Sequence, residues 1–418
     1  MDFDIPADIQ ATLNGLDAFI EAEILPLQHA DDNMRFFDHR REWARTDFDN
    51  DGVPRAEWEA LLAEMRRRAD TAGWLRWALP AEFGGHDASN LEMAIIREHL
   101  ARRGLGLHND LQNESSIVGN FPTVLMMRDF GTPEQIAEWM PGFLDGSRRL
   151  AFGLTEPEHG SDATYMETRA VADGDGWVIN GAKRWNSGLH HATHDIIFAR
   201  TSGEPGTPNG ITAFLVPTDA EGFSVEFFWW TFNMPTDHAE VTLTDVRVDP
   251  EVVFGEVGQG LYLAQHFVHE NRIRQAASSL GAGQFCVDEA VRYANERVTW
   301  GKPLAVNQGI QFPLVELHTE AAMLRQLIRE TACGSISSII WRSPIRWRCA
   351  TTGRTGSPVM PRIGPCRPAG EWATAVTCPS STSIDITAAT ASPRGPRRSR
   401  CARSPSSSSG SAVHGPDL

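Results

Sequence analysis

The apolar residues of this chain change period twice, and this limits the folds that the chain can adopt. Up to about residue 147 they recur every three or four positions, as in ADIQATLNGLDAFIEAEILPL and RAEWEALLAEMRRRADTAG. From about Leu150 to Val248 the period is two, as in ITAFLVPTD and AEVTLTDVRV. After Gly255 the helical period returns for about forty residues. We therefore predict an α+β protein in the order helical, β, helical.

These changes of period place the expected domain boundaries. We predict an N-terminal α-helical domain at 1–147, a middle β-barrel or sandwich domain at 148–255, and a C-terminal helical bundle at 256–332. Residues 333–418 form a separate tail, so we expect the bundle to be incomplete.

Local signals predict where several elements start and stop. Thr132 is expected to cap a helix that begins at Pro133 and ends at Gly146. The stretch LPAEFGG at Leu79–Gly85 is expected to interrupt the helices. In the β domain, the pair Asn180-Gly181 predicts a tight turn between strands.

The last 86 residues differ in composition from the rest. They hold eleven Arg and three acidic residues, a balance of +8, whereas residues 1–332 carry −24. Five of the six cysteines lie there without the spacing of a metal site. Pro, Gly, Ser and Thr are scattered through the segment, and no helix or strand is predicted. We expect this tail to be disordered.

The overall charge and hydropathy exclude some classes of partner. A net charge of −16 disfavours nucleic acid and anionic membranes, because both require a basic face. No apolar run approaches the ~18 residues of a membrane-spanning helix. The N-terminus MDFDIPADIQ lacks the features of a signal peptide, so a cytoplasmic protein is expected.

Three motifs carry the chemical signal. The first, LAFGLTEPEHGSD, joins the helical and β domains; GAKRWNS follows about twenty residues later, and NERVTWGKPLAVNQ comes after the long helix. A Pro/Gly-rich loop alone is usually only a connection. Together, and in this domain order, the three motifs resemble the acyl-CoA dehydrogenase family over about residues 10–332. The resemblance implies FAD as cofactor.

The first two motifs imply the flavin site. A flavin ring is flat and mostly apolar with a polar edge, so it needs an aromatic wall and a few positioned donors. By the family pattern Trp185 supplies the wall, although it could also be an ordinary core tryptophan. Thr155 and the backbone at Leu154 meet the polar edge, and Ser187 lies near N5. The full implied cofactor set is Phe152, Leu154, Thr155, Gly160, Ser161, Trp185, Ser187, Arg297, Thr299 and Gln308.

The third motif implies contacts between subunits. Arg297 and Thr299 resemble the family's contacts to the FAD pyrophosphate of a neighbouring subunit, and Gln308 resembles its adenine-side contact. An Arg near a helix C-terminus can equally serve the helix dipole. The resemblance implies a homodimer or homotetramer.

Two further assignments concern substrate and metal. Arg272 resembles an Arg that faces the CoA nucleotide, and Ser161 is placed beside the substrate as well as the cofactor. His269 and the pair His190–His191 show no metal-ligand spacing with a partner in the sequence, so we predict structural histidines and no metal site.

The catalytic base has no clear counterpart. Most of the family uses a Glu in a Thr/Tyr-Glu-Gly loop near the C-terminus, and no such tripeptide follows residue 300. A minority uses the residue before the match to Arg272, which is Asn271 here. Glu270 is the nearest carboxylate, but a shift of one residue turns it ~100° around a helix.

Back-translation gives a reason for this loss. The shifted frame joins the third base of each codon to the first two bases of the next. In this frame, Trp372-Ala373 must encode glycine and Asp385-Ile386 must encode His or Tyr. Continued past Pro393-Arg394, the shifted text is compatible with the family's last helices and ends in Thr-Glu-Gly. We therefore predict that residues after about Ala332 are translated out of frame.

The resemblance predicts α,β-dehydrogenation of an acyl-CoA in fatty acid metabolism, with electrons passed to an electron-transfer flavoprotein. Without its base, this chain is expected to be impaired. One alternative is a flavin oxidase or monooxygenase on the same fold, which the reaction of its reduced flavin with oxygen would distinguish. Another is a non-catalytic product of a damaged gene.

Overall fold

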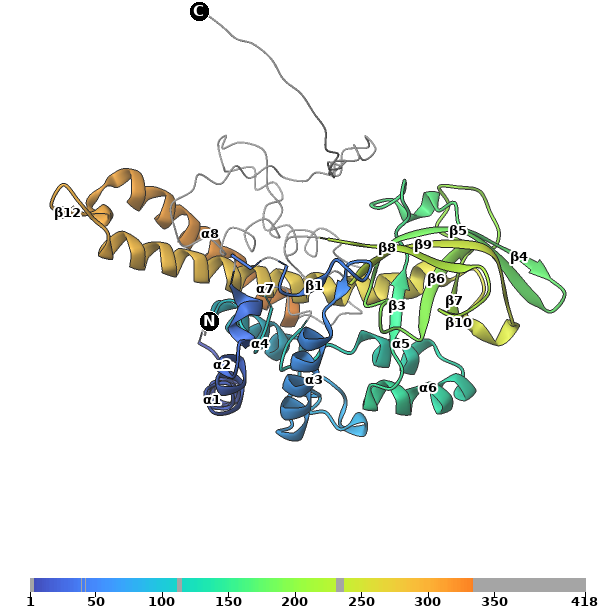
Figure 1. The fold of residues 1–418 in the computed structure, drawn as a ribbon, viewed down its shortest axis with the longest axis horizontal. Coiled ribbons are helices and arrows are strands. Elements are labelled where there is room, and N and C mark those ends of the chain that lie inside the picture. Colours follow the sequence, from blue (N-terminus) through green and yellow to red (C-terminus); the bar gives the residue numbers. More distant parts are fainter. Residues whose placement is uncertain (1–3, 39, 42, 111–114, 231–236, 334–418) are drawn as a thin grey trace, which may run out of the picture. The chain divides into compact units, whose positions relative to one another are not determined.

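The computed structural model describes residues 4–38, 40–41, 43–110, 115–230 and 237–333. Figure 1 shows helices first, then a sheet, then two long helices along the chain. This is the predicted α+β order. The tail predicted to be out of frame lies outside the described residues, apart from Cys333. No described helix is long and apolar enough to cross a membrane.

The N-terminal part is built from amphipathic helices around an apolar core. Leu13, Leu16 and Ile20 are fully or almost fully buried at three- and four-residue spacing, which explains the helical period of the sequence. The helices are α1 (Ala7–Phe19), a π-helical turn (Ile20–Ile24), α2 (Leu25–His29), α3 (Ala56–Thr71), α4 (Asn90–Arg102), α5 (Pro122–Phe130) and α6 (Pro133–Asp145). A small hairpin joins β1 (Thr46–Asp47) to β2 (Val53–Pro54).

The start and stop signals of α6 are confirmed. The Thr132 side chain accepts from the Gln135 N–H, and the Gln135 side chain accepts from the Thr132 N–H, which makes a capping box. Pro133 is the first helical residue, and Gly146 ends the helix at φ 79°. The predicted break at Leu79–Gly85 holds only a 3₁₀ turn, Ala81–Phe83.

The middle part is one eight-stranded sheet. Its order is β10-β7-β6-β4-β5-β9-β8, with β3 parallel to β6 and the other extended pairings antiparallel. The edge strands β10 and β8 do not pair in the described chain, so the sheet is not a closed barrel. The strands are β3 (Leu150–Gly153), β4 (Arg169–Asp173), β5 (Gly176–Ser187), β6 (His194–Arg200), β7 (Ile211–Pro217), β8 (Phe223–Trp229), β9 (His238–Val248) and β10 (Val253–Phe254).

The predicted turn at Asn180-Gly181 is wrong. Strand β5 runs through this pair, and the turn lies earlier, at Gly174 (φ 62°) and Asp175. The Asn180 side chain hydrogen-bonds across the sheet to both the side chain and the backbone N–H of Asp245. A pair that is typical of turns is therefore used to hold two long strands together.

Two long helices end the described chain. α7 (Gly260–Glu296) and α8 (Gln308–Cys333) are joined by a hairpin of β11 (Val298–Thr299) and β12 (Lys302–Pro303). α7 packs closely on α4, since a Cβ on Gly281 would lie 2.2 Å from the Glu98 carbonyl. Short 3₁₀ segments complete the structure: Asn33–Phe37, Ala163–Tyr165, Pro250–Val252 and Leu304–Val306.

Candidate active site

The loop after β3 is tied to β5 at the point where the first two motifs meet. The Arg184 N–H donates a hydrogen bond of 2.8 Å to the Thr155 carbonyl. Thr155 is half-buried, and a Cβ on Gly160 would lie 4.0 Å from its Cγ2. The structure therefore brings Thr155 and Gly160 beside the strand segment that carries Trp185.

Trp185 has an unusual backbone and an accessible ring. The pairing of β5 with β9 shifts register between Arg184 and Asn186, and Trp185 between them has a φ of 68°. This left-handed conformation is strained for a bulky residue. The indole is 39% exposed and packs against Trp229 with ring centroids 5.0 Å apart. Trp185 is therefore not an ordinary core tryptophan.

Ser187 presents its hydroxyl at the end of β5. The residue is exposed, and its Oγ lies 2.7 Å from His238 Nδ1. His238 also approaches Trp185, with ring centroids 6.4 Å apart. Sequence reasoning missed His238, because it lies on β9, fifty-one residues further along the chain.

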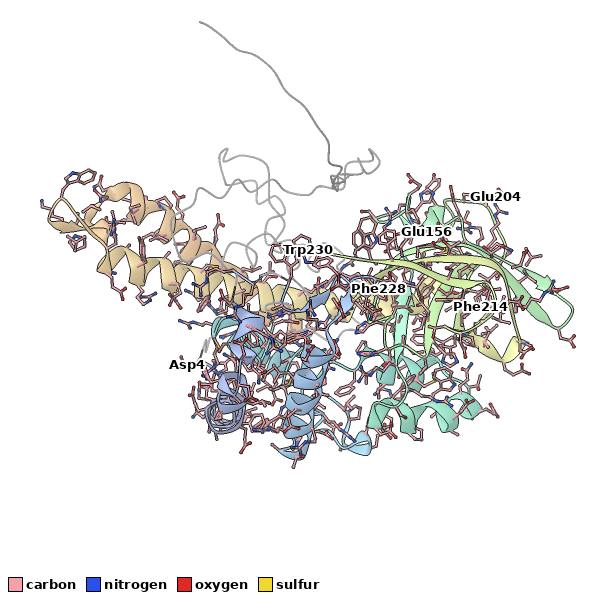
Figure 2. All side chains as sticks on the ribbon, in the orientation of Figure 1. Asp4, Glu156, Glu204, Phe214, Phe228 and Trp230 are labelled. Carbon is pink, nitrogen blue, oxygen red and sulfur yellow. The ribbon has the colours of Figure 1, made fainter. Side chains whose placement is uncertain are left out.

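A buried ion pair lies beneath this surface. The Lys183 Nζ is 2.9 Å from Glu156 Oε1 and 3.5 Å from the Leu154 carbonyl. Glu156 (labelled in Figure 2) also accepts the backbone N–H groups of Glu167 and Thr168. It therefore holds both ends of the loop between β3 and β4. Both charged residues stand in the quoted motifs, but neither was assigned a role from the sequence.

The pKa values in this pair follow from burial and pairing. Burial would raise the pKa of Glu156, but Lys183 and the two N–H donors outweigh it, so that pKa lies below its usual range. Burial lowers the pKa of Lys183 to about 8, against the opposing effect of Glu156. Each partner therefore favours the charged form of the other.

A second buried acid interacts electrostatically with the same lysine. Asp195 is fully buried on β6 and accepts a short hydrogen bond from the Asn186 side chain. Burial raises the pKa of Asp195 to about 7, opposed by Asn186 and Lys183. Gly153 fits against this pair only because it lacks a side chain, since its Cβ would lie 2.8 Å from Asn186 Nδ2.

Phe152 connects the site to the C-terminal helices. Its ring stacks on Phe267 of α7, with centroids 4.3 Å apart and an interplanar angle of 23°. It also contacts Phe198 of β6 at 5.0 Å. Strand β3 and the start of the Leu154–Thr155 loop are thereby held against α7.

Comparison with known proteins identifies this arrangement. The sequence matches the acyl-CoA dehydrogenase N-terminal domain over residues 30–147, the middle domain over 151–246 and the C-terminal domain over 258–335. An acyl-CoA dehydrogenase of Mycobacterium tuberculosis is 32% identical over 272 residues, which cover 65% of this chain and 68% of the relative. The chain belongs to the acyl-CoA dehydrogenase family.

Two more relatives extend the comparison. The CarC subunit of the caffeyl-CoA reductase–Etf complex of Acetobacterium woodii is 32% identical over 263 residues, or 62% of this chain and 67% of that one. The structure of butyryl-CoA dehydrogenase from Megasphaera elsdenii aligns with a TM-score of 0.62 and 26% identity, covering 80% of each chain. Acyl-CoA dehydrogenases are FAD-dependent flavoproteins, which agrees with the cofactor that the motifs implied.

The third motif lies far from the first two. Arg297 follows the last residue of α7, thirty residues beyond Phe267, which is about 45 Å along a helix. Arg297 and Gln308 are exposed, and Thr299 is half-buried in the hairpin. The structure therefore does not bring these three residues to Thr155 and Trp185 of the same chain.

The remaining predicted residues are on α7 and in the loop. Arg272 and Asn271 are half-buried, and the buried Asn271 Oδ1 makes no hydrogen bond to any residue that the structure describes. The side chain of Glu270 lies outside the described residues, so its suitability as a base stays a prediction. Ser161 is exposed in the loop that Glu156 anchors.

Proposed function

We propose that this chain derives from an enzyme that carries out FAD-dependent α,β-dehydrogenation of an acyl-CoA thioester. The observation that carries the proposal is the hydrogen bond from the Arg184 N–H to the Thr155 carbonyl. It joins the loop of the first motif to the strained backbone of the second, and so places Thr155 close to Trp185.

The residues present fit a bound flavin. Trp185 offers an exposed aromatic surface, and Ser187 offers an exposed hydroxyl on the same strand end. Among the described residues, nothing lies within 4 Å of a Cβ built on Gly188, and only Thr155 approaches one built on Gly160. Gly160 is exposed and Gly188 is half-buried, and the lack of a side chain at both suits the close approach of a cofactor. Trp185, Thr155 and Ser187 would hold the flavin, and Gly160 and Ser161 would lie nearer its phosphates.

When bound, FAD would accept a hydride from the substrate. This chain's residues would bind and orient the acyl thioester, with Arg272 directed to the CoA nucleotide. Proton removal from the α-carbon needs a positioned carboxylate, and this chain lacks the family's C-terminal Glu. Loss of a general base typically costs about 10²- to 10⁴-fold in rate. We therefore propose that the chain as written is impaired.

The electron acceptor and the assembly follow by analogy with the relatives. One relative is a subunit of a complex that contains an electron-transfer flavoprotein, which supports such a protein as the acceptor. The distance along α7 supports a cofactor site shared between copies, in which Arg297 of one chain meets the flavin of another. A homodimer or homotetramer would meet this requirement.

Exposed apolar side chains on the last helices support the incomplete bundle. Phe312, Val315 and Met323 on α8 are each more than half exposed in the described chain. Apolar surface of this kind is normally covered by further helices or by another subunit. Its exposure would favour aggregation and loss of cofactor.

Turnover and flavin content test these proposals separately. The chain as written and a version restored to the other frame would be purified, and their bound flavin measured by absorbance. Both would then be assayed on several acyl-CoA thioesters with a ferrocenium acceptor. We expect turnover from the restored version and little or none from the chain as written. Comparable rates from both would show that the base, the frame or both are misidentified.

A further inference from the structure

The structure gathers three metal-ligating side chains that the sequence keeps far apart. His190 and His191 lie in the turn after β5, and Glu59 lies in the first turn of α3. Their ligand atoms all lie within 4.8 Å of one another. The sequence showed no partner for the two histidines, because Glu59 precedes them by about 130 residues.

The distances suit a shared ion better than a set of hydrogen bonds. His191 Nε2 is 3.0 Å from Glu59 Oε2, which is a hydrogen bond. His190 Nε2 is 3.6 Å from Glu59 Oε1, which is too long for one. Tetrahedral zinc with bonds of about 2.1 Å separates its ligand atoms by about 3.4 Å, and each histidine lies near this distance from one of the two Glu59 oxygens.

His190 gives the second, independent observation. Both of its ring nitrogens are buried, and neither has a hydrogen-bond partner in the described structure. The ring is enclosed by His191, at 4.0 Å between centroids, and by Phe228, at 6.1 Å. An unsatisfied buried polar group is costly and often marks an ion or water that would satisfy it.

We propose that Glu59, His190 and His191 form a binding site for a divalent transition metal, with Zn²⁺ as the preferred ion. Two imidazoles and one carboxylate are a ligand set that zinc uses, with a fourth position left for water. Arg66 and Arg149 act electrostatically on this cluster and oppose a cation. We therefore expect micromolar affinity. The ion would fasten α3 to the turn that follows Ser187.

Calorimetric titration of the full-length protein with Zn²⁺ tests the site. The protein is first treated with a chelator, and its six cysteines are alkylated, because thiols also bind zinc. We expect one equivalent to bind, with at least tenfold weaker binding in His190→Asn and in His191→Asn. Glu59→Gln, which keeps the shape but removes the charge, should weaken binding by about tenfold.

His159→Asn is the matched control, because His159 also contacts a glutamate, Glu167, at 3.3 Å but belongs to no ligand cluster among the residues that the structure describes. Its zinc affinity should equal that of the unchanged protein. The His191 ring is exposed, so His191→Asn should fold even if His190→Asn does not. The proposal is overturned if the unchanged protein binds no zinc at concentrations up to about 100 μM. It is also overturned if His191→Asn binds zinc as tightly as the control.

Discussion

Lys183 and Glu156 form an ion pair of 2.9 Å in which both side chains are almost completely buried. The pair joins β5 to the loop after β3, and these two segments carry Trp185 and Thr155. An exposed salt bridge at this place would add little stability, but a buried one cannot lose one partner without leaving a charge in a dry interior.

Replacing one partner should therefore be severe. We expect Lys183→Met to lower the free energy of unfolding by about 3–5 kcal/mol, because Glu156 would remain buried without its counter-ion. Urea denaturation monitored by tryptophan fluorescence measures the change. The double variant Lys183→Met/Glu156→Gln should recover much of the loss, since neither position of the pair then carries a charge.

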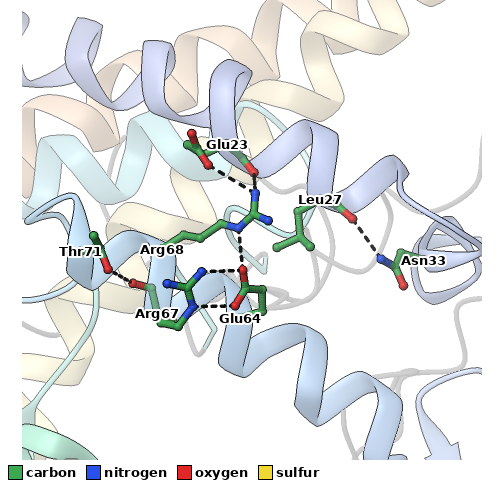
Figure 3. Close-up of polar contacts among 7 residues, drawn as sticks. All are labelled: Glu23, Leu27, Asn33, Glu64, Arg67, Arg68 and Thr71. Atoms are coloured by element: carbon green, nitrogen blue, oxygen red, sulfur yellow. Dashed lines mark hydrogen bonds and ion pairs between the residues drawn. The ribbon is translucent and has the colours of Figure 1, made fainter.

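A surface pair provides the control for this prediction. Figure 3 shows Glu64 bound by Arg67 and Arg68 on α3, where the side chains are partly or largely exposed. Glu64→Gln should change stability far less than Lys183→Met. Equal effects at the two places would show that the Lys183–Glu156 pair is as well solvated as a surface pair.

Asp195 should make stability depend on pH. Burial raises its pKa from 3.8 to about 7, so the folded protein binds a proton that the unfolded chain releases between these values. The contribution of Asp195 to the free energy of unfolding must therefore fall as the pH rises from about 4 to about 7. Asp195→Asn removes this dependence, so its stability relative to the unchanged protein should rise over that window by up to about 4 kcal/mol.

Denaturation of both proteins at several pH values between 4 and 8 gives this difference directly. Groups that titrate in both proteins, such as His108, cancel in the comparison. Parallel stability curves for the two proteins would mean that Asp195 is ionised throughout the window in the folded state.

Local features could be predicted from the sequence, because a few adjacent residues determine them. The capping box of Thr132 and Gln135 is one example. The two long motifs are another, since a short loop and a strand carry Thr155 and Trp185. That Thr155 and Trp185 lie close together could be expected without knowing how the domains pack.

Features that depend on register or tertiary contact could not be predicted. Lys183 lies in β5 after one register shift and before another. Because each shift changes which side chains face the core, the alternation of inward and outward residues along the strand does not predict that Lys183 faces inward. Asn180-Gly181 has the chemistry of a turn, but its cross-strand bonds to Asp245 prevail. Glu59 meets His190 only because α3 packs near the turn after β5, and no periodicity shows this.

Trp185 has a φ of 68°, and at such a position a glycine variant should be more stable than an alanine variant, which reverses their usual order of stability. Glycine adopts this conformation freely and alanine does not, so Trp185→Gly should be more stable than Trp185→Ala by about 1 kcal/mol. Both variants should retain less flavin than the unchanged protein, because the aromatic surface is lost. Thermal unfolding and flavin absorbance provide the two measurements.

Trp177, at the other end of β5, is the matched control because its φ is not positive. At this position, Trp177→Ala should be more stable than Trp177→Gly by about 0.5–1 kcal/mol. The same ranking at both tryptophans would argue against a strained backbone at Trp185.

Two glycines of α7 allow a test of how closely this helix meets α4. A Cβ on Gly281 would lie 2.2 Å from the Glu98 carbonyl oxygen and 3.0 Å from the Arg102 nitrogen, and these backbone atoms cannot move aside alone. We expect Gly281→Ala to cost about 1–3 kcal/mol by forcing the two helices apart. Gly283, one half-turn away, has no described residue within 4 Å of its Cβ position, so Gly283→Ala should instead gain about 0.5–1 kcal/mol. Urea denaturation measures the change in the free energy of unfolding for each variant, and we expect the two changes to have opposite signs. A stabilising Gly281→Ala would show that α7 and α4 are not in close contact.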